Sequence, residues 1–210
     1  MEKLKKYDLV VPYLPAGEGK PVEVKIEKVN WPGSYPYAPE VKARLWHDGD
    51  NLHIEYEVDE EYVAALADND NGEVWKDSCV EFFVSLDGNG YYNLESNCTG
   101  KVLLSHRLGR KDNVEYASED VLKGIKRDPS LGSSPFAVRK SDGKWTLKLV
   151  VPATTFFKTG IESFKGIDAK CNIYKCGDEL PVPHFLSLFP IKTENPDFHR
   201  PEFFGTVHFE

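Results

Sequence analysis

The stretch VWKDSCVEFFVSLDGNGYYNLESNCTG, residues 74–100, is the basis of our fold prediction. Apolar side chains recur at every second position of its first half, at Val80, Phe82, Val84 and Leu86. This period is typical of a β-strand with one buried face. The GNG at 88–90 predicts a tight turn, so the strand-like run 91–97 should be an antiparallel neighbour of the first strand.

The same two runs carry polar side chains on their other face. Glu81 and Phe83 alternate with the apolar set, and in the second run Glu95 and Asn97 do the same. We therefore expect Glu81, Glu95 and Asn97 to share one exposed sheet face. Ordinary solvated surface is one interpretation, but an outward Phe83 requires cover from a loop, another strand or a ligand.

Period-two alternation extends over most of the chain, while helix signals are scarce. The DGDN at 48–51 and the SDGK at 141–144 predict hairpin turns. Short helical turns are expected only at 60–67 and 152–160. Strands are predicted at 22–29, 41–47, 52–58, 79–86, 91–97, 101–107, 121–126, 136–140, 145–151, 170–176 and 204–209. This pattern favours an all-β fold, an antiparallel β-sandwich of jelly-roll or immunoglobulin-like type with few short helices, in a single domain over residues 1–210.

The charge balance excludes some classes of partner. A net charge of −8 disfavours nucleic acid, whose phosphates require a basic face, and an anionic membrane surface. No stretch approaches the length of a membrane-spanning helix. The N-terminal segment has lysines but no continuous apolar core, so we expect either a cytoplasmic protein or a mature form whose leader was removed.

The cysteine and acidic residues offer candidate structural or metal sites. Cys171 and Cys176 should lie on opposite faces of one strand, about 16 Å apart and too far for a disulfide. Cys79 and Cys98 lie in different strands and could pair, or remain buried thiols. The oxygen-rich DNDNGE at 68–73 offers Asp68 and Asp70 as candidates for a structural Ca²⁺, with a polar turn as the alternative. No cofactor is otherwise expected.

Two kinds of chemistry fit the polar face of residues 74–100. A sugar presents C–H patches that stack on an aromatic ring such as Trp75, and hydroxyls that pair with carboxylates and amides. Alternatively, Glu81 and Glu95 could be the acid pair of a glycoside hydrolase, since two carboxyl groups at short range are the arrangement of that class. The sequence shows no other recognised catalytic motif.

The residues assembled so far resemble a known family. W-x-D-x-x-V-E-F-F at 75–83 and Y-x-x-x-x-N-x-x-G at 92–100 are similar to the core signature of family 9 carbohydrate-binding modules and their DOMON-like relatives. The ending, with FHRPEFFG at 198–205, resembles that of stand-alone family-9-like bacterial proteins, and the hairpin at 45–58 fits the early strands.

The resemblance implies a β-sandwich that binds sugars without cleaving them, between two aromatic rings and above polar side chains. It implies Trp75 as the first ring, Glu81 as the carboxylate and Asn97 as the amide. Asp59 matches a further acidic contact, and Phe198, or else Phe189, matches the second ring. Glu95 stands where the family has an arginine, which implies altered hydroxyl recognition.

The haem-binding DOMON branch is also implied by the likeness, but it requires Met and His axial ligands, and the single methionine is Met1. We therefore expect a non-catalytic binder of a mono- or oligosaccharide, with glycoside hydrolysis as the alternative.

Overall fold

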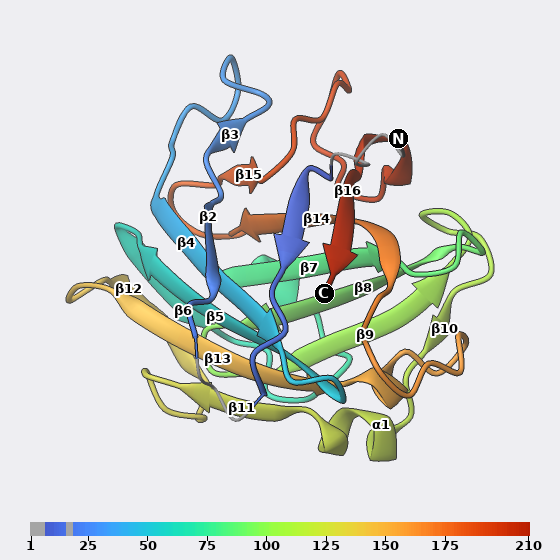
Figure 1. Ribbon diagram of the computed structural model, residues 1–210. Coiled ribbons are helices and arrows are strands. Elements are labelled where there is room, and N and C mark those ends of the chain that lie inside the picture. The colour runs from blue at the N-terminus through green and yellow to red at the C-terminus, as the bar shows by residue number, and fades with distance from the viewer. Residues whose placement is uncertain (1–6, 16–18) are drawn as a thin grey trace.

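The computed structural model of the protein describes residues 7–15 and 19–210. Two large sheets pack face to face, as Figure 1 shows. The nine-stranded sheet has the order β1 (Leu9–Val11), β16 (Gly205–Phe209), β14 (Asp168–Cys176), β7 (Cys79–Ser85), β8 (Tyr91–Asn97), β9 (Val102–Arg107) and β10 (Glu115–Tyr116), and β15 (Phe185–Ser187) with β3 (Lys28–Val29) extends from β14. The five-stranded sheet has the order β11 (Lys126–Pro129), β13 (Trp145–Pro152), β5 (Asn51–Asp59), β4 (Glu40–His47) and β2 (Val22–Lys25).

The smaller elements complete this architecture. A two-stranded sheet pairs β12 (Phe136–Lys140) with β6 (Tyr62–Ala65). The helical elements with bounds in the described residues are α1 (Glu119–Gly124) and the single 3-10 turns η2 (Val74–Lys76), η3 (Ala153–Thr155) and η4 (Pro201–Phe203). The predicted β-sandwich is thereby confirmed. No helix among the described residues is long and apolar enough to cross a membrane.

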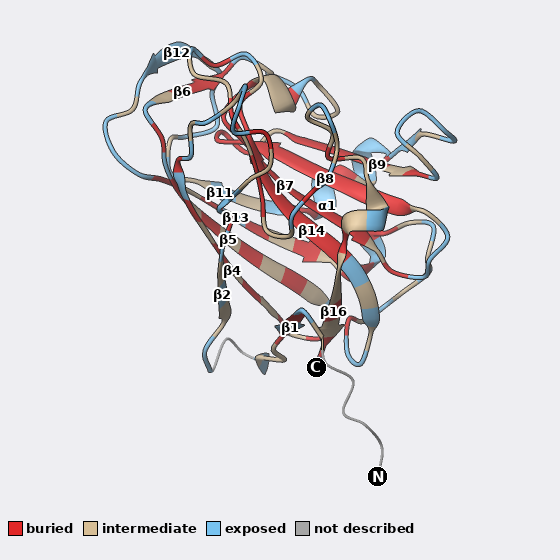
Figure 2. Ribbon diagram, turned by 90° about the horizontal axis from the view of Figure 1, so that it is seen from above, coloured by how far each residue is buried: buried red, intermediate tan, exposed pale blue. Residues whose placement is uncertain are grey.

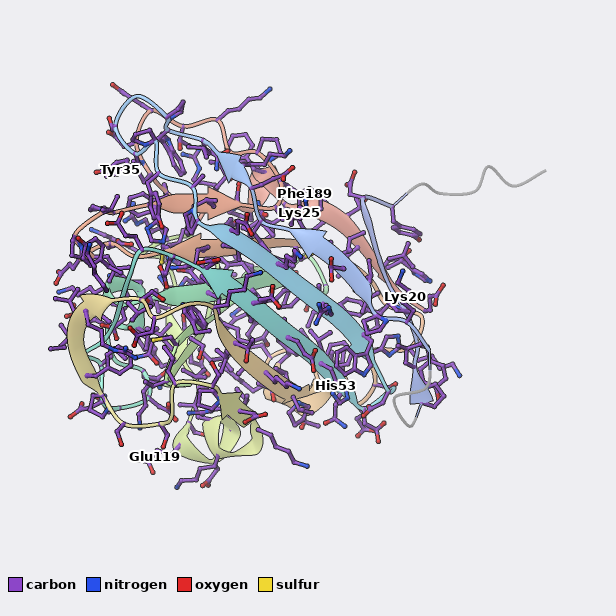
Figure 3. The ribbon with its side chains drawn as sticks, turned by 90° about the vertical axis from the view of Figure 1, so that its left-hand side faces the viewer. Lys20, Lys25, Tyr35, His53, Glu119 and Phe189 are labelled. Atoms are coloured by element: carbon purple, nitrogen blue, oxygen red, sulfur yellow. The ribbon has the colours of Figure 1, made fainter. Side chains whose placement is uncertain are left out.

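The main core lies between the two large sheets and follows the predicted alternation. In β5, Leu52, Ile54, Tyr56 and Val58 are buried, and they meet the alternate residues of β7 and β8 in one apolar cluster. The polar face of β4 and β5 points away from this core, with Trp46 stacked on His53 at 4.7 Å between ring centroids. Figure 3 views that outer face, with His53 labelled on β5.

A second apolar cluster covers the opposite face of the nine-stranded sheet. It joins Phe83, Tyr91 and Tyr174 of the central strands to Phe198 and Phe204 of the C-terminal segment. Consequently β7, β8 and the part of β14 from Cys171 to Cys176 are buried on both faces, whereas β4 and β5 alternate between buried and half-buried positions, as the colouring of Figure 2 shows.

The hairpin prediction for 41–58 is confirmed, because β4 and β5 pair in register from Glu40 opposite Asp59 to His47 opposite Leu52. The predicted hairpin at SDGK is wrong, since β12 pairs with β6 and β13 pairs with β5. The run 22–29 is divided between β2 and β3, which belong to different sheets.

Two further expectations were reversed. Residues 121–126 were expected as a strand, but α1 begins after Ser118, whose side chain accepts a hydrogen bond from the N–H of Val121 as an N-cap. Residues 60–67 were expected to be helical, but β6 occupies 62–65 because Val63 and Ala65 are buried in the main core. The predicted turn at 152–160 is confirmed by η3. Met1 and the rest of residues 1–6, with which the N-terminal segment begins, lie outside the described residues.

Candidate functional site

The polar residues of the opening stretch lie on one sheet face, as predicted. In the β7–β8 ladder Glu81 is directly opposite Glu95, and Asn97 is opposite Cys79. Their neighbours Val80, Leu94 and others of the alternate set face the main core. The register therefore brings the two carboxyl side chains together across adjacent strands.

The expectation that this face is exposed is wrong. Glu81 is 3% exposed, Glu95 4% and Asn97 0%. The C-terminal segment packs over this side of the sheet through Phe198 and Phe204, while Asn97 is enclosed by its hydrogen bonds to Asp77, Thr99 and Lys101. Phe83 receives the cover that an outward Phe requires, with its ring edge-to-face on Tyr174 at 5.0 Å and tilted against His199 at 5.1 Å. This cover leaves part of the face open as a cavity.

The cavity has a volume of about 500 Å³, within the range typical of small-molecule sites. Aromatic and apolar side chains form its walls, while acidic and basic side chains reach its floor and rim. It is lined by Trp75, Glu81, Glu95, Leu103, Arg107, Arg110, Lys111, Val114, Tyr116, Cys176, Asp178, Phe185, Pro196, Asp197, Phe198 and His199.

Two of the predicted aromatic residues line this cavity. Trp75 is half-buried on η2, and within the described residues its ring is not paired with another aromatic ring. Its backbone carbonyl accepts hydrogen bonds from the Cys176 thiol and the Asp178 N–H, which anchors the turn to the end of β14. Phe198 is stacked on Tyr174, with the ring centroids 4.2 Å apart and an interplanar angle of 6°.

Two other candidates lie elsewhere. Asp59 is exposed at the end of β5, in the five-stranded sheet, and it does not line the cavity. Phe189 packs against Gly205 and contributes to the main core, and it does not line the cavity either. Of the two alternatives for the second ring, Phe198 is the one at the cavity.

Asn97 is fully occupied by internal hydrogen bonds. Its Nδ2 donates to Asp77 Oδ2 at 2.9 Å, and its Oδ1 accepts from the N–H and hydroxyl of Thr99 and the N–H of Lys101. Asp77 in turn accepts from the N–H groups of Leu66 and Ala67. Asn97 does not line the cavity and instead fixes the loops beside it.

Arg107 was not predicted as a site residue from the sequence. It supplies a positive charge to the floor of the cavity. It lies on β9 opposite Tyr91, with its Nε donating to Asn93 Oδ1 and Ser105 Oγ, each at 2.9 Å. Asn93 donates to Glu95 Oε1 at 2.8 Å, which links the guanidinium to the carboxyl. Arg107 thus places a guanidinium on the strand beside Glu95, the position at which the resemblance implies an arginine. Arg107 occupies one of the odd-numbered positions of β9, and these alternate with the residues that face the main core. The sequence shows this alternation, but only the strand pairing places Arg107 at the cavity.

Burial changes the protonation of the acidic pair. Burial, followed by the nearby Glu95, raises the pKa of Glu81 well above its usual range, and burial raises the pKa of Glu95 to about 7. Adjacent buried carboxyl groups disfavour a second negative charge, so protonation of this pair is favoured near neutral pH. Burial also raises the pKa of Asp178 to about 6.

The opposite wall of the cavity is basic. Arg110 pairs with Asp197 at 3.5 Å, and Lys111 lies beside it on the rim. His199 shares a hydrogen bond of 3.0 Å with the Tyr91 hydroxyl through Nδ1. Burial, together with Arg107 and Arg110, lowers the pKa of His199 to about 3, so this ring is neutral.

The four cysteines are free and buried, so the Cys79–Cys98 pairing considered from the sequence is not formed. Cys171 faces the main core and Cys176 the cavity side, which confirms their placement on opposite faces of β14. Cys79 lies directly opposite Cys176.

The calcium candidates lie apart from the cavity. Asp70 Oδ1 pairs with Arg127 at 2.6 Å and accepts the Val102 N–H, while Asp68 is exposed. The carboxylate of Asp70 is thus engaged by a guanidinium, and a structural Ca²⁺ at this loop stays a prediction.

Comparison with known proteins places this geometry in a family. Residues 18–209 match the sequence profile described as Carbohydrate-binding family 9. The chain belongs to this family. No curated protein matches the chain.

Solved structures agree with this assignment. A Bacteroides uniformis ATCC 8492 crystal structure, described as a candidate carbohydrate-binding protein, is 40% identical, with a TM-score of 0.90 over 96% of this chain and 98% of that chain. A family 9 module from Caldicellulosiruptor kristjanssonii in complex with glucose is 13% identical, with a TM-score of 0.53 over 96% and 95% of the two chains. A cellotriose complex of a family 9 module from the same organism is 12% identical, with a TM-score of 0.50 over 96% and 93%. The two Caldicellulosiruptor structures share the fold.

Proposed function

We propose that this family 9 protein binds a mono- or oligosaccharide in the cavity beside β7, β8 and β9, without cleaving it. The observation that carries the proposal is the cavity of about 500 Å³ with aromatic walls and a polar floor, in a chain of a carbohydrate-binding family. The proposal treats residues 1–210 as one binding domain.

Each part of the cavity has a role in this proposal. Trp75 and Phe198 stack on the C–H patches of the sugar ring. Arg107 and Glu95 contact hydroxyls on the floor, with the arginine donating and the carboxyl donating or accepting according to its protonation. Asn97 acts indirectly, by holding the loops that border the cavity.

The choice of first ligands follows from the relatives. The Caldicellulosiruptor modules are described in complex with glucose and cellotriose, so these sugars are the first to test. Because Glu95 stands where the resemblance implies an arginine and Arg107 supplies a cation from the next strand, we propose that the preferred hydroxyl arrangement differs. A glycan array extends the test to other sugars.

The binding test uses calorimetric titration of the wild-type protein and of two tryptophan variants with the best ligand from the array. Trp75→Ala should weaken binding by about 1–3 kcal/mol, by analogy with stacking of bases on aromatic rings. Trp46→Ala is the matched control, because Trp46 lies on the outer face of the five-stranded sheet and stacks on His53. Equal affinities in both variants would remove Trp75 from the site.

Glycoside hydrolysis is the second candidate, and the raised pKa of Glu95 favours it, because a general acid must hold a proton near neutral pH. The binding proposal predicts no turnover of aryl glycosides or of the bound oligosaccharide between pH 4 and 8. Turnover that is lost in both Glu81→Gln and Glu95→Gln would replace the binding proposal with a catalytic one.

A further inference from the structure

We propose that Cys79, Glu81 and Cys176 form a binding site for a thiophilic divalent cation, Zn²⁺, at the floor of the cavity. Strands β7 and β14 are antiparallel neighbours, with Cys79 directly opposite Cys176. Glu81 follows two residues after Cys79 and therefore points to the same face. The ligand atoms of the three side chains lie within 4.8 Å of one another.

The distances fit tetrahedral zinc. Zinc binds thiolate at about 2.3 Å and carboxylate oxygen at about 2.1 Å, so neighbouring ligand atoms should be about 3.5 Å apart for S···O and 3.8 Å for S···S. Glu81 Oε1 lies 3.1 Å from Cys176 Sγ and 4.0 Å from Cys79 Sγ. These two distances bracket the expected value, and the paired strands hold the ligands in place.

The burial of the Glu81 carboxyl group and its lack of strong hydrogen-bond donors are a second observation that points to a ligand. The side chain is 3% exposed, and its Oε1 receives hydrogen bonds only from the two thiols, which are weak donors. Among residues 7–15 and 19–210 no side chain or N–H is found donating to its Oε2, and this oxygen is not one of the fully enclosed unpaired polar atoms, which fits its place at the cavity. A buried carboxyl without strong partners is costly, and a coordinated cation would satisfy it.

The site is open to an incoming ion on one side. Glu81 and Cys176 line the cavity, and Asp178 lines it next to them, whereas Cys79 lies beneath, fully buried. An ion entering through the cavity meets three protein ligands, and its fourth position faces the cavity, within reach of Asp178 or a water molecule. Three protein ligands with one open position are also a known zinc arrangement.

The ligand set selects the type of metal. Two thiolates favour Zn²⁺ over Ca²⁺ and Mg²⁺, which prefer oxygen ligands. With both thiols deprotonated and Glu81 ionised, the three ligands carry three negative charges, of which the ion neutralises two. This site is separate from the Asp68–Asp70 loop, and it does not depend on the sugar-binding proposal.

The test is titration of the reduced, tag-free, chelator-treated protein with Co²⁺, followed by displacement with Zn²⁺. A thiolate-to-cobalt charge-transfer band should saturate at one ion per chain and disappear on adding zinc. Cys79→Ala and Cys176→Ala should abolish the band. Cys171→Ala is the matched control, since Cys171 is equally buried but faces the main core, and it should retain the band.

Glu81→Gln is nearly isosteric and keeps the test valid if a cysteine variant fails to fold. It should weaken zinc binding by at least about tenfold, the lower end of the effect of changing even an outer-shell partner. A missing band in the fully reduced wild-type protein, a retained band in Cys176→Ala, or unchanged zinc affinity in Glu81→Gln would overturn the proposal.

Discussion

Glu95 is an acid whose charge state depends on its surroundings near physiological pH. Its Oε1 accepts a hydrogen bond from Asn93, and Arg107 lies nearby, yet burial dominates and raises its pKa to about 7. A raised carboxyl pKa means that folding favours the protonated form. The stability that this proton contributes is complete below the unfolded pKa near 4.5 and is lost as the pH rises through about 7.

Glu95→Gln should therefore change the pH dependence of stability. Glutamine imitates the protonated acid at every pH. The stability of the variant relative to wild type should therefore increase from pH 5 to pH 8, by up to about 3 kcal/mol. Urea unfolding at the two pH values, in the presence of a chelator, measures this. Glu194→Gln, at an exposed position, should show no such gain. If the free energy of unfolding changed equally with pH in both variants, the prediction would be contradicted.

For single residues, the sequence predicts the sheet face on which a side chain lies, but not how deeply that side chain is buried. Period-two alternation correctly put Glu81, Glu95 and Asn97 on one face. It did not reveal that Phe198 and its neighbours, a hundred residues later, pack over that side of the sheet, or that burial raises the pKa values of Glu81 and Glu95. Arg107 and the Cys79–Cys176 pair were missed for the same reason, because only strand pairing brings them to the cavity.

Among the elements, the end of β8 determines how the loops around the cavity are held. Asn97 joins the β8–β9 turn to Asp77 and so to the loop that carries Trp75. Gly100 completes the turn with a φ of 80°, which favours glycine. The side chain of Asn97 thus ties two loops together from a fully buried position.

Asn97→Ala should destabilise the protein by about 2–4 kcal/mol, because several buried partners lose their hydrogen bonds. Urea unfolding measures this. Asn89→Ala is the matched control in the exposed β7–β8 turn and should stay within about 0.5 kcal/mol of wild type. Wild-type stability combined with a large loss of sugar affinity in Asn97→Ala would instead indicate direct contact with the sugar.

Local pattern predicted most strands, and the two segments that were assigned the wrong type of element have clear causes. Residues 60–67 contain good helix formers, but β6 buries Val63 and Ala65, so tertiary packing overrides propensity. Residues 121–126 alternate weakly, but the Ser118 cap and the acidic first turn favour α1. Both elements lie outside the strands that line the cavity.

For the molecule as a whole, a buried ionic cluster connects the two large sheets. Glu60 follows β5 and accepts the indole N–H of Trp145 at 2.7 Å, while Lys175 Nζ of β14 lies 2.9 Å from its Oε2 as an ion pair. His184, which precedes β15, accepts a hydrogen bond from Lys175 at 2.9 Å. Burial alone would raise the pKa of Glu60, but Lys175 and His184 outweigh it and hold this pKa at about 2.

Lys175→Met should therefore lower the free energy of unfolding by about 3–5 kcal/mol at pH 7, because it leaves Glu60 buried without its main cation. A depressed carboxyl pKa contributes stability above the unfolded value near 4.5, and this contribution is lost as the pH falls through about 2. The variant lacks this contribution, and its Glu60 takes up a proton at a higher pH.

The difference between Lys175→Met and wild type should consequently shrink as the pH falls below about 4.5. Urea unfolding at pH 7 and pH 4 measures this. Lys144→Met provides the control, because its ion pair with Glu57 is partly exposed and such pairs contribute about 0–1 kcal/mol. A loss in Lys175→Met no greater than in Lys144→Met would show that apolar packing, rather than this cluster, joins the sheets at that end.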